Sequence, residues 1–146
     1  MFRHRIAAGG LVIDGGRILL VRYPEGYLVA PGGAIEDGES LAAAAEREVE
    51  EETGVRCKAG GPVLIENIRA RNYQMVKVWY LCHFTGGSAS RTAGAEEEGI
   101  VEVGWYASDE LAAETVFPAI VKTMGLEELA RFQPRVLDAG VCHADF

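Results

Sequence analysis

Three glutamates on one predicted helix carry the strongest chemical signal in the sequence. Glu48, Glu51 and Glu52 are spaced i, i+3, i+4, so their carboxylates are neighbours on an α-helix. Glu48 and Glu52 fall inside or at the edge of the apolar stripe of that helix, and Glu51 lies just outside it. The stripe consists of Leu41, Ala42, Ala45 and Val49. Because like charges repel and buried charges cost free energy, the sequence predicts a positive partner for this cluster.

A divalent cation is the partner that this pattern favours. Hard cations such as Mg²⁺ prefer oxygen ligands and often bind through a few carboxylates together with the phosphates of a substrate. The planar guanidinium of Arg47 can reach Glu39 or a carboxylate of the cluster and fix its orientation. Ahead of the helix, Pro31, Gly32 and Gly33 allow the backbone to turn tightly and to approach a ligand.

These residues lie in a stretch that closely resembles the Nudix box of the Nudix hydrolase family. The box is Gly, five residues, Glu, seven residues, Arg-Glu, an aliphatic residue, any residue, Glu-Glu, any residue, Gly and an aliphatic residue. The chain matches every fixed position, at Gly33, Glu39, Arg47, Glu48, Val49, Glu51, Glu52, Gly54 and Val55. The preceding Pro31-Gly32 also matches the family. Leu28 stands where the family often has a Trp.

The resemblance implies a hydrolase, dependent on Mg²⁺ or Mn²⁺, that cleaves the pyrophosphate bond of a nucleoside diphosphate linked to another moiety. Nucleoside triphosphates, ADP-ribose or other nucleotide sugars, and dinucleoside polyphosphates are the substrate classes. Metal ligation is implied for the Gly32 carbonyl, Glu51 and Glu52. Glu48 is implied as a ligand or as the general base, and the residues that orient the cluster are Glu39 and Arg47.

A further acid from a late loop often joins this site in the family, as a ligand or as the base. Glu96, Glu97 and Glu98 are the candidates, and no motif ranks them. Glu97 is named here as the catalytic acid of this run, although the sequence supports the three residues equally. For each of them the alternative is an ordinary solvated charge in a polar loop.

Candidate substrate contacts are cations, aromatic residues and a glycine. Arg22 and Lys77 are candidate phosphate contacts, Tyr27 is a candidate for stacking on a nucleobase, and Gly33 permits close approach of the backbone. The same arguments apply to Arg69, Arg71, Tyr73 and Trp79. For each of these residues a surface cation or a core aromatic is the competing interpretation.

Composition bounds the kind of partner. The 146 residues are 49% hydrophobic and 25% charged, which predicts one soluble globular domain over residues 1–146. A net charge of −8 argues against a nucleic-acid polymer or an anionic membrane as the main partner and leaves a small-molecule nucleoside diphosphate derivative. Cys57, Cys82 and Cys142 are interpreted as reduced thiols, and no signal peptide or membrane-spanning run is evident, so a cytoplasmic location is expected. The resemblance leaves a homodimer open.

Hydrophobic periodicity predicts the elements that must position the site. Strands are expected over residues 4–13, 17–22, 27–30, 63–68, 72–84 and 100–106, with both faces of 17–22 and 72–84 covered. A helix is expected over Leu41–Thr53, capped by Ser40 and ended by Gly54. Residues 59–62 are expected to break the chain, and 85–98 to form a loop. Ser108 is expected to cap a short helix, and Phe117 to begin a helix to about residue 131, interrupted at Gly125. The fold predicted is α+β, and the resemblance implies an α/β/α sandwich around a mixed sheet.

Three competing interpretations remain open. A solvated acidic helix accounts for Glu46 and Glu50, but not for acids on the inner side or for the glycine loop. A Nudix-fold sensor that binds a nucleotide metabolite without cleaving it would not need every acid of the box. A Nudix-fold isomerase of isoprenoid diphosphates would need further acid–base groups and usually a longer chain.

Overall fold

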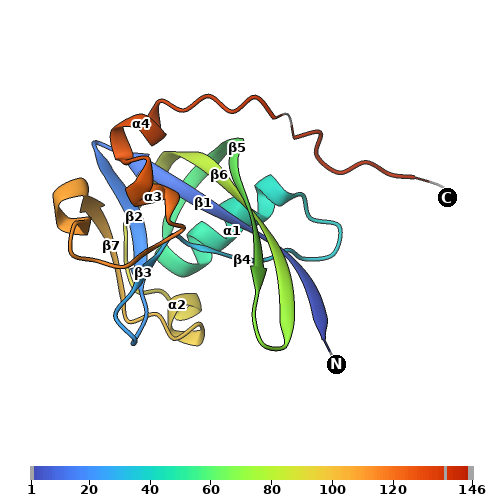
Figure 1. Cartoon of the computed structure of the whole chain (residues 1–146), viewed down its shortest axis with the longest axis horizontal. Coiled ribbons are helices and arrows are strands. Elements are labelled where there is room, and N and C mark those ends of the chain that lie inside the picture. The colour runs from blue at the N-terminus through green and yellow to red at the C-terminus, as the bar shows by residue number, and fades with distance from the viewer. Residues whose placement is uncertain (1, 137, 145–146) are drawn as a thin grey trace.

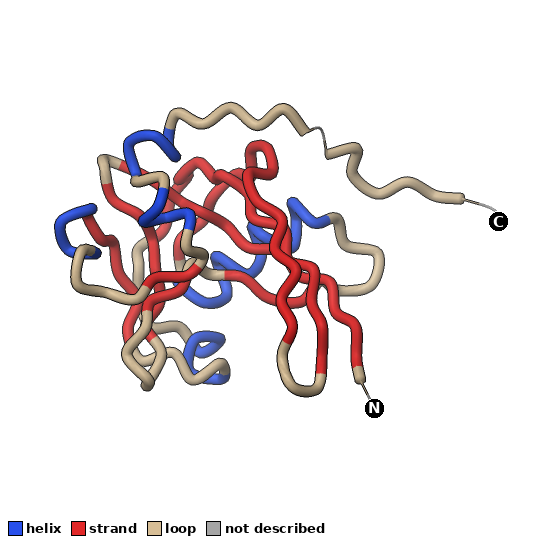
Figure 2. Tube along the Cα trace, in the orientation of Figure 1, coloured by secondary structure: helices blue, strands red, loops and turns tan. Residues whose placement is uncertain are grey.

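A mixed β-sheet forms the centre of the computed structural model, which describes residues 2–136 and 138–144 (Figures 1 and 2). Its strands are β1 (Arg3–Asp14), β2 (Arg17–Arg22), β3 (Leu28–Val29), β4 (Gly32–Ala34), β5 (Val55–Arg69), β6 (Tyr73–Gly87), β7 (Glu102–Ala107) and β8 (Val116–Phe117). They follow the order β5-β6-β1-β2-β3-β8, with β4 beside β1 and β7 beside β2. β1 runs parallel to β6 and antiparallel to β2, so the sheet is mixed, as predicted.

Helices cover the sheet on two sides (Figure 1). α1 (Leu41–Thr53) packs on one side, where Ala45 and Val49 join a core that includes Val12 and Tyr80. α3 (Ile120–Thr123) and α4 (Leu126–Ala130) cover the opposite side. There Val121 of α3 and Leu129 of α4 share a core with Leu11, Leu20 and Trp79 of the sheet. The architecture is therefore the α/β/α sandwich that the resemblance implies.

β6 shows why its residues form a strand with both faces covered. Its even-numbered residues Val78, Tyr80 and Cys82 belong to the core beneath α1, whereas Trp79 belongs to the core beneath α3 and α4. Successive side chains of a strand point to opposite faces, so this alternation divides one strand between two cores. β2 is divided in the same way. The predicted burial of both faces is confirmed for β2 and for the middle of β6, residues 77–82, whereas Val76 and Phe84 near its ends are exposed because neither core extends that far.

Two glycines let β1 pass close to bulky neighbours. A Cβ built on Gly9 would lie 2.3 Å from the Trp79 ring, and one on Gly10 would lie 2.7 Å from a methyl carbon of Val49. The close approach that the sequence predicts at this glycine pair is therefore present, and Gly9 is what allows the indole to lie flat against β1.

We expect Gly9→Ala to destabilise the protein by about 1–3 kcal/mol, since the new methyl group overpacks a well-filled core. Chemical denaturation of the variant and the parent measures this difference. Gly104→Ala is the matched control, because its Cβ would meet Tyr106 at an ordinary contact distance of 3.4 Å. Equal stability of the two variants would contradict the close packing described for Gly9.

The helix that carries the acidic cluster begins and ends where local chemistry predicts. The Ser40 hydroxyl accepts a hydrogen bond from the Ala43 amide at 3.1 Å, which satisfies a free N–H at the helix start. Gly54 adopts the left-handed conformation with φ 76° and returns its amide to the Glu50 carbonyl. The predicted bounds of α1 are confirmed.

Two predictions between residues 55 and 98 are wrong. Residues 59–62 do not break the chain; β5 continues through them, with its register to β6 shifting on either side of Pro62 as in a β-bulge. The segment 85–98 is not all loop, because β6 extends to Gly87 and α2 (Ala93–Glu97) follows. The Thr92 hydroxyl caps α2 by accepting a hydrogen bond from the Ala95 amide. This capping residue was overlooked because the whole segment is rich in small and polar residues.

The C-terminal predictions need two further corrections. Ser108 is the first residue of the short 3-10 helix η1 (Ser108–Leu111), and Ala107 precedes it as the cap, its amide donating to Glu110 at 3.0 Å. Phe117 ends strand β8 and does not begin a helix, and the expected long helix is divided into α3 and α4 at Gly125, with φ 86°. In the part of the chain that the structure describes, no helix is long and apolar enough to span a membrane.

Candidate active site

Strand β4 brings the glycine loop against α1. Gly32 pairs with Gly9 on β1, and Gly33 pairs with Ala8. A Cβ on Gly33 would lie 2.7 Å from the Glu48 carboxyl group, and one on Gly32 would lie 2.7 Å from the Gly9 Cα. Only glycine fits at both positions without a shift, so the Glu48 carboxylate occupies the space that a side chain at residue 33 would fill.

Glu52 is a buried carboxylate next to this loop. Only 3% of Glu52 is exposed, and its carboxylate accepts a long hydrogen bond of 3.4 Å from the Gly32 amide. Burial, followed by the charge of Glu48, raises the pKa of the Glu52 carboxyl to about 8, while Lys77 acts in the opposite direction. Burial also raises the pKa of Glu48. The two acids therefore share a site that lacks full compensation of negative charge.

Arg47 ties three acids of the box together. Its Nε donates to Glu39 at 2.7 Å, and its Nη1 donates to Glu48 at 2.9 Å and to Glu51 at 3.1 Å. Its Nη2 donates to Glu39 and to the Ala34 carbonyl, both at 3.0 Å. The sequence left open whether Arg47 reaches Glu39 or the cluster, and the structure shows both contacts.

The donor set suits a hard divalent cation. Carboxylate oxygens and a backbone carbonyl are ligands that Mg²⁺ and Mn²⁺ take in proteins. Such an ion would neutralise the buried Glu52 and the partly buried Glu48. As the side chains stand, no three His, Cys, Asp or Glu residues within 2–136 and 138–144 converge closely enough to hold an ion. Arg47 pairs with both Glu48 and Glu51, and the Glu51 side chain is 51% exposed.

Lys77 lies beside the cluster from the β6 side. It is only 9% exposed, and its Nζ sits 4.2 Å from the centre of the Trp79 ring. A Cβ on Gly32 would lie 2.9 Å from the Lys77 Cε, so the lysine stem packs against the glycine loop. Burial lowers the pKa of Lys77, although Glu52 favours its charged form. In the structure, Lys77 is therefore the cation whose charge partly compensates Glu52.

The other predicted substrate contacts have protein partners. Arg22 donates to both oxygens of Glu114 at 3.0 Å and lies 3.5 Å from Glu102, so its charge is already paired. Tyr27 stacks on Tyr23 with ring centres 5.4 Å apart and meets Phe117 edge-on at 5.7 Å. Phe117 is 47% exposed, which leaves one end of this aromatic row open.

The acidic run 96–98 lies at the end of α2, next to the cluster. Thr92 donates its hydroxyl proton to the Glu51 carbonyl, and Gly94 approaches that same backbone so closely that a Cβ would lie 2.5 Å from its oxygen. Glu97 is exposed on α2. Glu98 caps the end of α2, and its charge is among those that raise the pKa values of Glu52 and Tyr23.

Sequence reasoning missed Tyr23, Phe117 and the particular role of Glu98. Tyr23 follows a strand in a turn, and burial together with Glu52 and Glu98 raises the pKa of its hydroxyl to about 12. The sequence could have indicated Tyr23, because it directly follows the buried strand β2. No local feature of the sequence indicated Phe117, since it reaches Tyr27 only through the pairing of β8 with β3, which are distant in the chain.

The site lies in an α/β/α sandwich in which an acidic helix packs against a glycine strand of the mixed sheet. A comparison with protein families identifies this class of domain, since the NUDIX domain model matches residues 3–124. The chain belongs to the Nudix family.

Individual relatives show how far the similarity extends. The mouse (Mus musculus) protein named 8-oxo-dGDP phosphatase NUDT18 is 33% identical over 76 residues, which cover 52% of this chain and 22% of that protein. The chain therefore spans less than a quarter of the length of this curated relative. The crystal structure of a MutT NUDIX hydrolase from Burkholderia pseudomallei is 27% identical, with a TM-score of 0.67 over 86% of this chain and 98% of that one. A NUDIX hydrolase from Nitrosomonas europaea, 22% identical with a TM-score of 0.71, shares the fold.

Proposed function

We propose that the protein hydrolyses the pyrophosphate bond of a nucleoside diphosphate linked to another moiety, with a divalent cation bound at the box. The observation that carries the proposal is the buried carboxylate of Glu52 beside the partly buried carboxylate of Glu48, both against Gly32 and Gly33. A structural helix gains nothing from burying Glu52 beside a second acid, Glu48, whose charge Arg47 already shares with Glu39 and Glu51. The solvated acidic helix does not account for them.

The groups that would hold the ion are the carboxylates of Glu48, Glu51 and Glu52 and the carbonyl of Gly32. Mg²⁺ or Mn²⁺ bound there would neutralise phosphate charge, polarise the phosphoryl group and lower the pKa of water. Arg47 and Glu39 hold the acids in place, since both are hydrogen-bonded within the cluster. The chain contributes a fixed arrangement of oxygen donors, and the ion contributes positive charge that the residues lack.

The general base is Glu48 or an acid of the run 96–98. Within that run we propose Glu98 ahead of Glu97, since the charge of Glu98 contributes to the raised pKa values of Glu52 and Tyr23. A base must reach the attacking water directly or through one further water. Glu98→Gln and Glu97→Gln, compared in turnover, distinguish these two residues from each other and from Glu48.

The nucleobase is proposed to stack on the aromatic row formed by Tyr23, Tyr27 and the exposed Phe117. Lys77 is proposed to approach a phosphate from the opposite wall, where it already faces Glu52. An Arg22 contact would require the arginine to leave Glu114. The name of the mouse relative adds nucleoside diphosphates with an oxidised base to the substrates to be tested.

The experiment that tests the function measures phosphate and nucleoside monophosphate release over a panel. The panel contains nucleoside di- and triphosphates, ADP-ribose, nucleotide sugars and dinucleoside polyphosphates, each with Mg²⁺, with Mn²⁺ and with a chelator. We expect metal-dependent release from one class. Binding of nucleotides without release over the whole panel would instead support the sensor, and release that a chelator does not stop would overturn the metal site.

We expect Gly33→Ala to lower turnover by about 10–100-fold with the fold retained, because the new methyl group displaces the Glu48 carboxylate that lies 2.7 Å away. Steady-state kinetics and thermal melting measure the two effects. Gly38→Ala is the control outside the cluster: no atom lies within 4 Å of its Cβ, although its φ of 79° makes the alanine strained. Normal turnover of Gly33→Ala would show that the Glu48 position is not needed.

A further inference from the structure

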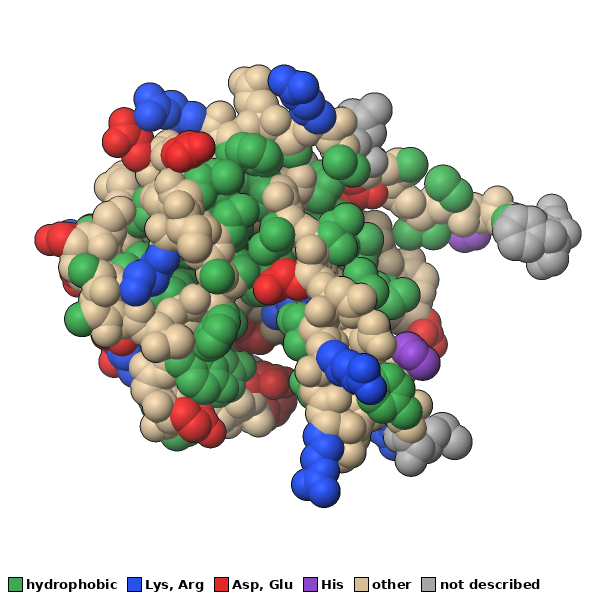
Figure 3. All heavy atoms as spheres, in the orientation of Figure 1, with side chains coloured by type: hydrophobic (Ala, Val, Ile, Leu, Met, Phe, Trp, Pro, Cys, Tyr) green, Lys and Arg blue, Asp and Glu red, His purple; other side chains and the backbone are tan. Residues whose placement is uncertain are grey.

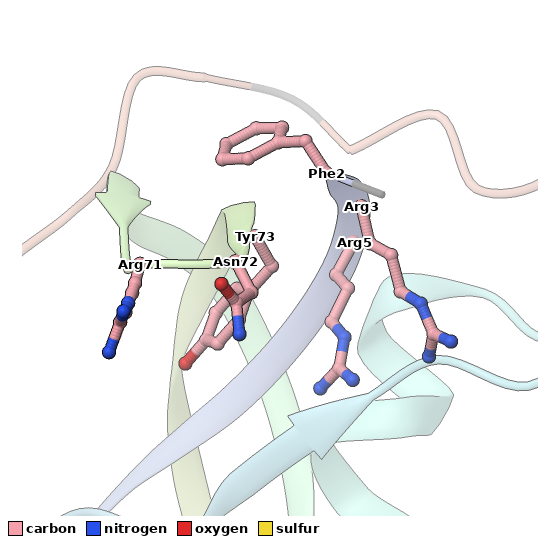
Figure 4. Close-up of a pocket in the computed structure, with 6 residues that line it drawn as sticks. All are labelled: Phe2, Arg3, Arg5, Arg71, Asn72 and Tyr73. Carbon is pink, nitrogen blue, oxygen red and sulfur yellow. The ribbon is translucent and has the colours of Figure 1, made fainter.

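A cavity of about 660 Å³ lies outside the carboxylate cluster, at the start of β1 and the turn between β5 and β6 (Figure 4). It is lined by Phe2, Arg3, Arg5, Arg71, Asn72 and Tyr73. The Arg5 guanidinium lies 5.0 Å from the centre of the Tyr73 ring, so an aromatic side chain supports one of three cations. Figure 3 shows basic side chains at this end of the molecule, where the N-terminus and the β5–β6 turn lie.

The pairing of β1 with β6 connects this cavity to the active site. Arg3 pairs with Tyr73, Arg5 with Met75 and Ala7 with Lys77. Alternate residues of a strand share a face, so the two arginines lie on the face from which Lys77 reaches the glycine loop. Gly9, which pairs with Gly32, is four residues from Arg5, about 13 Å along the strand. The cavity therefore lies on the same face of the sheet as Lys77, further along β1 toward the N-terminus.

The arginines of this cavity have no acidic partners among the described residues. The ion pairs of the described residues engage Arg22, Arg47, Arg91 and Arg131, whereas none of them includes a lining arginine of this cavity. The chain as a whole has a net charge of −8, so three arginines without acidic partners form a local exception. Figure 4 shows Arg71 on one side of the cavity and Arg3 and Arg5 on the other. Guanidinium groups without acidic partners that line one cavity are suited to bind a phosphate, each through two N–H donors.

We propose that the cavity binds a phosphate that the substrate carries away from its scissile pyrophosphate bond, such as a phosphomonoester on the ribose. The proposal rests on the proposed function and narrows its substrate class to nucleoside diphosphate derivatives with a distal phosphate. Arg5 and Arg71 bind that phosphate, and the Tyr73 ring supports the Arg5 guanidinium. A small molecule is favoured over a nucleic-acid polymer, because the chain as a whole carries a net charge of −8.

Two matched pairs of substrates test the proposal. Coenzyme A differs from dephospho-coenzyme A, and ADP-ribose 2′-phosphate from ADP-ribose, by one ribose phosphate. We expect KM to be about tenfold lower for the phosphorylated member of at least one pair, and this difference to shrink as salt is raised. Arg5→Gln combined with Arg71→Gln should abolish the difference and leave the unphosphorylated member within about twofold. Arg17→Gln changes an exposed arginine at the start of β2, opposite the far end of β1, and should leave the difference in KM intact.

A binding measurement separates this proposal from the proposed function. Calorimetric titration with adenosine 3′,5′-bisphosphate, adenosine 2′,5′-bisphosphate and AMP needs no turnover. A bisphosphate that binds about tenfold more tightly than AMP, with the gap lost in the double variant, supports the cavity even if every hydrolysis assay is silent. Hydrolysis of the panel with no gap in KM or in binding overturns the cavity and leaves the hydrolase standing. A gap that persists in a folded double variant also overturns it.

Discussion

Glu52→Gln is expected to lower turnover by about 10²–10³-fold without loss of folding. Glu52 is the most buried acid of the box, and its carboxylate is a proposed ligand next to the Gly32 amide. An amide of the same shape cannot supply the negative charge that a cation needs, and loss of one electrostatic stabiliser of a transition state has an effect of this size. Steady-state rates over a Mg²⁺ series measure it.

The same substitution should not reduce stability in the absence of metal. The Glu52 carboxyl is buried next to Glu48, and this environment disfavours its charged form, so that a neutral amide removes a desolvation cost. We expect an unchanged or higher melting temperature in chelator, and a smaller rise on adding Mg²⁺ than in the parent. Glu50→Gln, on the exposed side of α1, is the control. Near-normal turnover of Glu52→Gln with a retained metal response would remove Glu52 from the site.

Arg47→Gln is expected to destabilise the metal-free protein by about 2 kcal/mol and to lower turnover. The arginine is the shared donor of Glu39, Glu48 and Glu51, and removing it leaves half-buried carboxylates without their counter-charge. Because a bound divalent cation would compensate Glu48 and Glu51, Mg²⁺ should recover part of the lost stability. Denaturant unfolding with and without Mg²⁺ measures both effects.

Arg131→Gln is the matched control for Arg47. It also removes an arginine from a helical i, i+4 pair, with Glu127 at 3.0 Å, but both side chains are largely exposed. Its effect should stay within about 0.5 kcal/mol, as for surface pairs in general. If Arg47→Gln cost no more than this control, the role of Arg47 as the organiser of the acids would be wrong.

Local chemistry explains the parts of the fold that the sequence predicted. Ser40 and Gly54 mark the ends of α1 through contacts within a few residues, and the alternation along β6 needs only the geometry of a strand. α2 was not predicted, because its stability depends on contacts with a distant part of the chain. A helix of five residues is too short to be stable alone, and Thr92 and Gly94 hold it against the Glu51 backbone, far earlier in the chain.

By itself, the sequence determined the family resemblance, the acidic helix and the set of residues from which a metal site can be built. The tertiary structure alone decided what those residues face. It buried Glu52 opposite Lys77, paired Arg22 with Glu114 and left the lining arginines of the N-terminal cavity without acids. The physical reason is that burial and charge compensation depend on contacts between distant segments, which the pairing of β1 with β4 and β6 sets.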